Sequence, residues 1–486
     1  LAGGLTKDTL NYGLGQVLPK AIGFLLIPLY MTYLSPEEFG LVDLAGTVGA
    51  FMMVTMRLGV PNAITRFYFD HSGSALRDYI TSIYWFIIII SVATSLIFLA
   101  AGYWGLDWMV PGLPFWPFFV LSISTAFFNS NSEIQRKLLQ VRRKSAYTSA
   151  LNVTFALSTI VLSIFLVVVM DWGALGIVVA STFAAFIFFI QAQVYLHRDL
   201  GGSLQFSRMK ESFRFGIVLL PYHVYGHFAP IVTKSILSAT GSLAAVGVLA
   251  IASKFTQPLT ILITAFGAAF TPNYLEIRAR NEPTENVRLG KLIQRIWLGA
   301  CMLFVAFFLY ADLFSLFATN SYSRAGDLIK LLSLGFLPQL FYVIFSHELF
   351  FRKENTLSLL INLIGISLGL LLSWLLVQPW HEVGAGLAVI IPSISGGVLM
   401  YYFTRRKLVF DPHMKRIMGL FLLTQAVAAL DYFVIGELEG VLWRFAVKTV
   451  LFAALLGAVY LADPGLKSDL RELKNKLISR SRGNHS

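Results

Sequence analysis

Apolar stretches long enough to cross a bilayer recur along the whole chain and constrain its fold more than any other feature. A membrane-spanning helix needs about 20 apolar residues, and windows of that length predict fourteen spans. These spans are residues 8–33, 39–58, 79–102, 115–133, 147–170, 174–196, 214–235, 242–265, 292–311, 327–349, 356–377, 383–403, 417–435 and 441–461. With 56% hydrophobic and 13% charged residues, the composition excludes a soluble domain. We predict an all-α, polytopic membrane protein.

Lysine and arginine gather in alternate loops, which predicts the orientation of the spans. The basic groups before the tail are Arg66 and Arg77; Arg136, Lys137, Arg142, Arg143 and Lys144; Arg198, Arg208, Lys210 and Arg214; Arg278, Arg280, Arg288, Lys291 and Arg295; Arg352 and Lys353; and Arg405, Arg406, Lys407, Lys415 and Arg416. The intervening loops contain one basic residue, Arg324. Because cytoplasmic loops are enriched in these residues, we expect both termini in the cytoplasm of a bacterial inner-membrane protein. The net charge of +12 therefore reflects topology, and nucleic acid is not an expected partner.

Catalytic and metal-binding motifs are absent from the sequence. Cys301 is the single cysteine, which excludes an intrachain disulfide and a cysteine-based metal site. There is no GxxxxGK[ST], HExxH or CxxC motif. The first apolar segment lacks a small-residue cleavage site, so we expect a retained span instead of a signal peptide. We expect no cofactor, no metal and no enzymatic activity.

The chain divides into two similar halves. Span seven begins FRFGIVLLP where span one begins NYGLGQVLP, and two six-span units of the same orientation are typical of transporters with parallel repeats. We predict two six-helix lobes in parallel pseudo-repeat plus two C-terminal helices. The predicted parts are an N-terminal lobe at 1–200, a cytoplasmic amphipathic linker at 201–213, a C-terminal lobe at 214–405, two added spans at 406–462 and a basic amphipathic tail at 463–486.

Lys20 lies in the middle of the first predicted span. If the span begins near Asp8, Lys20 is about 18 Å deep in a hydrocarbon layer about 30 Å thick. With Gly13 and Gln16 it forms one polar helix face. Ionisable residues at such depth usually face a bundle interior or a water-filled cavity, so we predict that this face lines a cavity.

Three other predicted spans carry charged faces. His223, His227, Pro230 and Lys234 lie on one face of span seven, at spacings of 4, 3 and 4. Asp43 and Arg57 share a face of span two, and Gly247, Lys254 and Gln257 share a face of span eight. We interpret these faces as lining one cavity. Its excess of positive charge predicts an anionic substrate such as phosphate or pyrophosphate, since unpartnered buried charge is costly.

Simpler interpretations exist for several of these residues. Arg57 could be an ordinary boundary residue, and Lys234 could extend outward to the interface. The two histidines could be neutral packing residues, and Asp43 could pair with a lysine and hold two helices together. Lys330 and Lys448 lie nearer to predicted span ends, where they could also extend to the interface.

The N-terminal region resembles a known family. The run YGLGQVLPKAIGFLLIPLYMTYLSPEEFGLVDL, followed by RLGVPNAITRFYFD from Arg57 to Asp70, is similar to the Wzx-type oligosaccharide and polysaccharide flippases of the multidrug/oligosaccharidyl-lipid/polysaccharide transporter superfamily. The Pro-Glu-Glu turn before Phe39 and Gly40 and the stretch from Ala63 to Arg66 carry the likeness.

This resemblance implies a flippase that moves a polyprenyl-pyrophosphate-linked oligosaccharide, such as an O-antigen unit of lipopolysaccharide, to the periplasmic leaflet by alternating access. It implies a pyrophosphate contact for Lys20, Arg57 and Lys254. Helical spacing adds Lys234 to these contacts. The residues expected to line the cavity are His223, His227, Gln257, Gly13 and Gln16. Asp43 is the candidate for coupling to H⁺ or Na⁺. Expected partners are the lipid-linked substrate, membrane lipids and polysaccharide-assembly enzymes, and a monomer is expected.

Two other functions remain open. A cation-coupled multidrug exporter of the same superfamily would present inward carboxylates to cationic drugs, whereas this chain presents lysines. An integral-membrane glycan polymerase or ligase needs a sizeable outer region, whereas the longest predicted outer loop runs only from Asp312 to Gly326.

Overall fold

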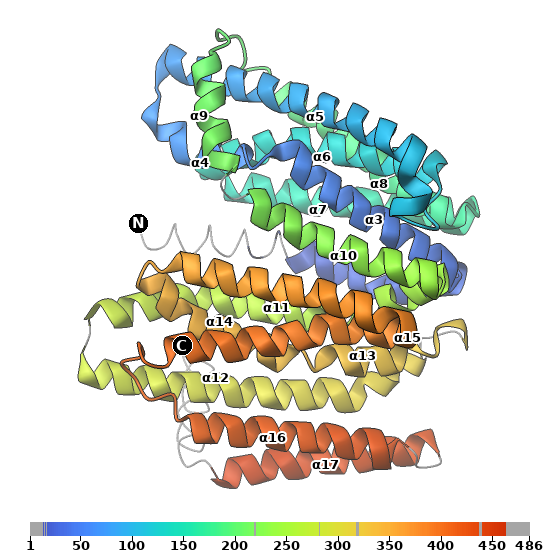
Figure 1. Cartoon of the computed structure of the whole chain (residues 1–486), viewed down its shortest axis with the longest axis vertical. Helices are drawn as coiled ribbons and strands as arrows, with labels where there is room; N and C mark the ends of the chain where they lie inside the picture. The colour runs from blue at the N-terminus through green and yellow to red at the C-terminus, as the bar shows by residue number, and fades with distance from the viewer. Residues whose placement is uncertain are drawn as a thin grey trace, which may run out of the picture. The chain divides into compact units, whose positions relative to one another are not determined.

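Helices make up almost all of the chain that this computed structural model describes, namely residues 13, 15, 17–217, 220–280, 282–316, 320–436 and 440–462 (Figure 1). No β-strand occurs in those ranges. The first apolar helix is Val17–Tyr33, which ends in α2 (Ile27–Tyr33). The others are α3 (Pro36–Arg57), α4 (Pro61–Phe67), α5 (Gly73–Met109), α6 (Val120–Val141), α7 (Ser145–Ile164), α8 (Gly173–Leu196), α9 (Phe206–Ile217), α10 (Leu220–Thr240), α11 (Leu243–Arg280), α12 (Pro283–Tyr310), α13 (Ala325–Ser333), α14 (Phe336–Phe351), α15 (Asn355–Thr404), α16 (Met414–Leu430) and α17 (Val441–Ala462).

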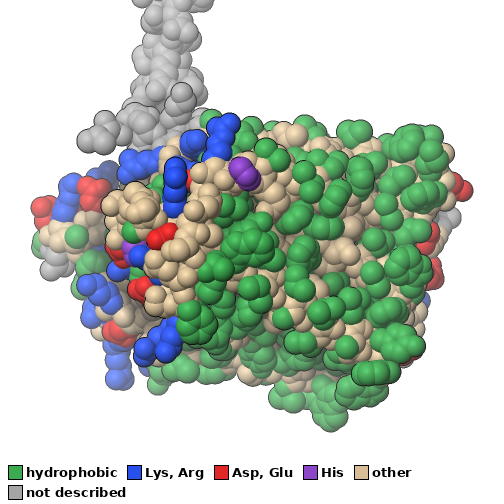
Figure 2. All heavy atoms as spheres, turned by 90° about the horizontal axis from the view of Figure 1, so that it is seen from above, with side chains coloured by type: hydrophobic (Ala, Val, Ile, Leu, Met, Phe, Trp, Pro, Cys, Tyr) green, Lys and Arg blue, Asp and Glu red, His purple; other side chains and the backbone are tan. Residues whose placement is uncertain are grey.

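The helices confirm a multi-pass membrane protein. In the described ranges, nine are long and apolar enough to cross a membrane by length and composition. Where the structure describes them, all fourteen predicted spans overlap helices, and α15 contains two of the spans, separated by non-helical backbone at His381. Hydrophobic side chains cover most of the face in Figure 2, and charged side chains gather toward its left edge. On α5, Leu96, Trp104 and Trp108 are 61%, 84% and 88% exposed, as lipid-facing residues should be.

Contacts divide the chain into two compact units. One unit comprises Leu1–Asn273 with Phe314–Lys407, and the other comprises Tyr274–Leu313 with Leu408–Ser486. In the second unit, α12 packs on α16 and α17, and Trp297 donates a hydrogen bond from Nε1 to the Ile417 carbonyl at 3.0 Å. The lobe and linker boundaries given above stay predictions.

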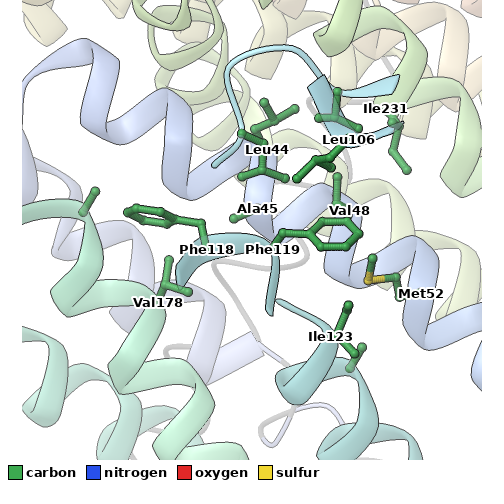
Figure 3. Packing of buried hydrophobic residues seen from close by; sticks show 14 of the residues in the cluster. Leu44, Ala45, Val48, Met52, Leu106, Phe118, Phe119, Ile123, Val178 and Ile231 are labelled. Atoms are coloured by element: carbon green, nitrogen blue, oxygen red, sulfur yellow. The ribbon is translucent and has the colours of Figure 1, made fainter. Parts of the chain in front are cut away.

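Within the first unit, α3 is the central helix of a large apolar cluster. Leu44, Ala45, Val48 and Met52 of α3 pack against residues from four other helical segments (Figure 3). These neighbours include Leu106, Phe118, Phe119, Ile123, Val178 and Ile231. The cluster holds α3 between α5, α6, α8 and α10, so the polar residues of α3 have fixed surroundings.

The Ser-Pro-Glu-Glu turn starts α3 through a capping box. Ser35 accepts a hydrogen bond from Glu38 N at 3.2 Å, and the Glu38 carboxylate accepts one from Ser35 N at 2.9 Å. Pro36 occupies the first helical turn, where its missing N–H costs nothing. The same Glu38 side chain accepts a bond from Ala174 N at 3.3 Å, which ties the start of α3 to the start of α8.

One turn later, α3 crosses α11 at two glycines. A Cβ on Gly40 would lie 2.0 Å from the Leu243 carbonyl oxygen, and a Cβ on Gly247 would lie 1.9 Å from the Pro36 carbonyl oxygen. Both obstacles are backbone atoms, which cannot rotate away. The two helices can therefore approach this closely only because neither residue has a side chain.

Two helix corners repeat at a fixed separation of 210 residues. Arg143 and Lys353 both have positive φ, at 55° and 61°, and each ends its helix with the same pair of backbone hydrogen bonds. The next corner repeats as well, with φ of 55° at Asp171 and 42° at His381. This correspondence is what a parallel pseudo-repeat of two six-helix units requires.

The first of these corners carries a half-buried arginine. Arg142 donates hydrogen bonds to both Asp199 oxygens, at 2.5 and 2.9 Å, and to the hydroxyls of Tyr68 and Tyr195. Burial alone would lower the pKa of Arg142, but Asp199 and the two tyrosines outweigh it and raise that pKa. The guanidinium therefore stays charged and joins α6 to the end of α8.

The segment before α10 is attached to the start of α5. Ser203 N donates to Asp78 Oδ1 at 2.7 Å, and Gln205 N donates to Ser82 Oγ at 2.9 Å. At the other end of α9, a Cβ on Gly216 would lie 2.6 Å from the Leu58 carbonyl oxygen. The predicted linker is thus held by backbone contacts as well as by its amphipathic composition.

We predict that Gly247→Ala destabilises the protein. Its new methyl group would meet the Pro36 carbonyl, and such overpacking costs ~1–3 kcal/mol. The matched control is Gly299→Ala in α12, where a Cβ meets nothing within 4 Å and the gain in helix propensity is up to ~1 kcal/mol. Thermal unfolding of the detergent-purified proteins measures the difference, and equal midpoints for both variants would contradict the crossing.

Candidate functional site

A cavity of about 720 Å³ lies beside α3. Its walls come from α3, α6, α8, α10 and α11, and most of its lining is apolar or small. The polar lining residues are Asp43, Thr47, Ser122, Thr125, Asn129, Ser181, His227 and Lys254. This volume is within the range of ordinary ligand sites. We call this space the main cavity.

A second cavity of about 530 Å³ lies on the other side of α10, and Gly226 and Pro230 line both spaces. Its charged lining residue is Lys234, and its other polar lining residues carry hydroxyl or amide groups. They are Thr233, Ser253, Thr256, Thr260, Gln339 and Ser393. The predicted polar face of α10 therefore lines one or the other of these two cavities along much of its length.

Lys234 is neutralised by Asp43. Its Nζ lies 2.5 Å from Asp43 Oδ2 and donates a hydrogen bond to Thr47 Oγ1 at 2.6 Å. Each side chain of the ion pair is 18% exposed, so solvent screens it only partly. Lys234 thus points inward instead of toward the interface, and the pair joins α3 to α10, as one of the simpler interpretations of Asp43 anticipated. A coupling role for Asp43 stays a prediction.

Lys254 has different surroundings. Its Nζ lies 5.8 Å from the centroid of the Phe39 ring, a cation–π distance, and its side chain is exposed along the main cavity. In the described part of the chain, no carboxylate lies within ion-pair distance of it. Gln257, one turn further along, is exposed but is not among the residues that line the main cavity.

Arg57 lies in a separate pocket of about 240 Å³ with His223. Arg57 donates from Nη2 to the Asn129 carbonyl at 3.1 Å, and the same nitrogen is 3.7 Å from Glu133 Oε2. Arg57 is 14 residues beyond Asp43, or about 21 Å along α3. The structure therefore does not bring Arg57 together with Lys234 and Lys254. His227 connects the two regions, because it lines the main cavity and its ring bonds to the His223 carbonyl at 2.9 Å.

Lys20 is exposed on the first helix and does not line either of the two cavities beside α10. Phe24, one turn later, packs edge-on against Phe255 with ring centroids 5.2 Å apart, so the helices that carry Lys20 and Lys254 are neighbours. Gly13 is exposed, and Gln16 lies outside the described residues.

Two lysines are more deeply buried than their sequence positions suggested. Lys448 is 2% exposed, with Nζ 2.8 Å from Asp431 Oδ1 and a second ion pair to Asp312. Lys330 is 5% exposed. Neither extends to the interface, and the two carboxylates stabilise the buried ammonium of Lys448. Among the described residues there is no cluster of histidine, cysteine or acidic side chains that could hold a metal ion.

Several residues at these sites escaped the sequence analysis. Phe39 was noted only as part of a motif, and Lys137 was counted with the basic loop residues that set topology. Glu133, one helical turn before Lys137, is the sequence feature that could have revealed the Arg57 pocket. An acidic residue among cations near a span end indicates a specific contact. Thr47 shared the helix face of Asp43 but gave no sign that it would bind a lysine.

The described helices form a multi-pass membrane fold that is shared with solved structures. The chain is similar to the solved structure "Lipid II flippase MurJ, inward closed conformation", with a TM-score of 0.73, 13% identity and coverage of 93% of this chain and 99% of that one. It is also similar to a multidrug resistance MATE family transporter of the MOP superfamily. The inward-facing form gives a TM-score of 0.56, with 85% of this chain and 94% of that one covered, and the outward-facing form gives 0.55, with 86% and 96% covered. Both are 15% identical to this chain, so the likeness establishes the fold alone.

The family follows from the sequence comparison. Residues 5–277, more than half of the 486-residue chain, match the family model described as polysaccharide biosynthesis protein. The chain belongs to this family, and the resemblance inferred from the N-terminal motifs is confirmed. Comparison with curated proteins gives no match.

We predict that the Asp43 and Lys234 substitutions are not additive. Asp43→Asn or Lys234→Met leaves one buried charge without its partner, which should cost up to ~3 kcal/mol and lower the unfolding midpoint. The double variant removes both charges and should recover much of that loss. Thermal unfolding of all four proteins measures the coupling, and a double variant that shows the sum of the two single losses would rule out the ion pair.

Proposed function

We propose that this protein is an alternating-access flippase for a polyprenyl-pyrophosphate-linked oligosaccharide. The single observation that carries the proposal is Lys254, a lysine exposed along a membrane-embedded cavity of about 720 Å³ and not paired to a carboxylate in the described part of the chain. Membership of the polysaccharide biosynthesis family points to a glycan intermediate as the cargo. The fold, shared with a lipid flippase, supports transport instead of catalysis.

The charge of the main cavity favours a phosphate-bearing substrate. Asp43 neutralises Lys234, so Lys254 provides the unbalanced positive charge, and a diphosphate oxygen is a natural partner for a lysine ammonium. Hydroxyl and amide groups of both cavities suit a glycan, whose hydroxyls need donors and acceptors. The substrate would thus present its diphosphate to Lys254 and its sugars to the neutral lining.

The remaining features of the proposal concern orientation and energy. The lysines and arginines of alternate loops support a bacterial inner-membrane protein with both termini in the cytoplasm. Transport runs from the cytoplasmic to the periplasmic leaflet. The membrane potential or a gradient of H⁺ or Na⁺ supplies the energy, with Asp43 as the coupling candidate. No cofactor is needed, the protein acts as a monomer, and partner enzymes supply and consume the lipid-linked unit.

Lysine replacement tests the cationic cavity. We expect Lys254→Ala to abolish flipping in proteoliposomes while the protein stays folded, because the diphosphate loses its charged partner in the main cavity. The sequence predicts the same loss for Lys20→Ala, on the neighbouring first helix. Arginine at either position should keep part of the activity, since it retains the charge. Lys291→Ala, an exposed lysine of α12, is the control and should flip at the normal rate. Full activity in both alanine variants would eliminate this mechanism.

Deletion of the gene separates the flippase from its alternatives. Cells without a flippase should accumulate complete lipid-linked units on the cytoplasmic face, which leaflet-specific labelling of the glycan detects. Loss of a polymerase would export single units instead. A drug exporter of the related fold would alter drug sensitivity alone, and that phenotype would refute the flippase.

A further inference from the structure

The pocket at the end of α3 shares three wall helices, α3, α6 and α10, with the main cavity. It is lined by Val54, Arg57, Gly59, Pro61, Asn62, Glu133, Lys137, Leu220 and His223. On α6, Asn129 lines the main cavity, whereas Glu133 and Lys137, one and two turns later, line the pocket. On α10, His227 lines the main cavity and His223 lines the pocket. The pocket therefore lies at the predicted cytoplasmic end of the main cavity.

Positive charge exceeds negative charge around this pocket. Glu133 is the one carboxylate among its lining residues, and it is shared by Arg57 at 3.7 Å and Arg136 at 3.4 Å. Lys137 lines the pocket without an ion pair to any described residue. The buried Nε of Arg57 likewise has no hydrogen-bond acceptor within the described ranges. The ammonium of Lys137 is thus available to an oxyanion, beside the guanidinium of Arg57.

We propose that this pocket is a first binding station for the diphosphate of the lipid-linked substrate, occupied before Lys254 receives it. The inference rests on the proposed function. About 21 Å of α3 separates Arg57 from Asp43, so one diphosphate cannot contact both of these residues at once. Arg57 and Lys137 bind the diphosphate where the substrate arrives, and His223 and His227 line the route inward.

Glu133 gives the station a limited affinity. Its carboxylate holds Arg57 and Arg136 in place, and its negative charge repels the incoming diphosphate. A transport path needs sites that bind well enough to admit the substrate and weakly enough to release it. The pocket therefore acts as a transient station, and the charges of Lys137 and Glu133 should affect its affinity in opposite directions.

The test measures binding of farnesyl diphosphate, a short polyprenyl diphosphate, to the full-length protein purified in detergent. We expect Lys137→Ala to weaken binding about tenfold, the usual effect of losing one charge-assisted contact. Glu133→Gln should strengthen it several-fold. Lys210→Ala, which removes an exposed lysine of α9 outside the pocket, should leave the affinity unchanged and serves as the control. A purely structural role for the two pocket residues would not produce effects of opposite sign.

Three outcomes would overturn the station. Unchanged affinity in Lys137→Ala, together with weaker binding in Lys254→Ala, would reject the station and leave the proposed function intact. Equal displacement of the probe by phosphatidylglycerol would identify a phospholipid site instead. Failure of the wild-type protein to bind farnesyl diphosphate would reject the proposed diphosphate site together with the station.

In proteoliposomes, Lys137→Ala should raise the half-saturating substrate concentration about tenfold and keep the maximal rate, whereas Lys254→Ala should lower the maximal rate.

Discussion

The crossing of α3 and α11 at Gly40 and Gly247 is the constraint on which the rest of the site depends. Because two backbones meet there, the residues near each glycine are held close to the partner helix. Phe39 then lies beside Lys254, and Asp43, one turn further along α3, reaches Lys234 of α10. A side chain at either glycine would separate α3 from α11, and with them Phe39 from Lys254.

The charges at the main cavity have distinct tasks. Asp43 and Lys234 neutralise each other and join two helices, whereas Lys254 keeps its charge beside an aromatic ring. An aromatic face attracts a cation without cancelling its charge, so Lys254 stays able to attract an anion. A carboxylate in place of Phe39 would hold the lysine more tightly and would also repel an anion.

Much of the fold could be predicted from the sequence, because hydropathy reports the spans directly. The polar face of α10 could also be predicted, since helical spacing alone puts His227, Pro230 and Lys234 on one side. Spacing cannot show which helix that face meets, so the partnership of Lys234 with Asp43 needed the tertiary structure. For the same reason Arg57 was grouped with Lys254, although the two lie in different cavities. The burial of Lys448 was missed because its partners, Asp312 and Asp431, come from distant segments.

The two predicted lobes repeat the helix corners but not the charged residues. α3 provides a carboxylate at Asp43 and has no lysine, whereas its close neighbour α11 provides Lys254 and has no acidic residue before Tyr274. The ion pair between Asp43 and Lys234 therefore joins the two predicted lobes and opposes their separation.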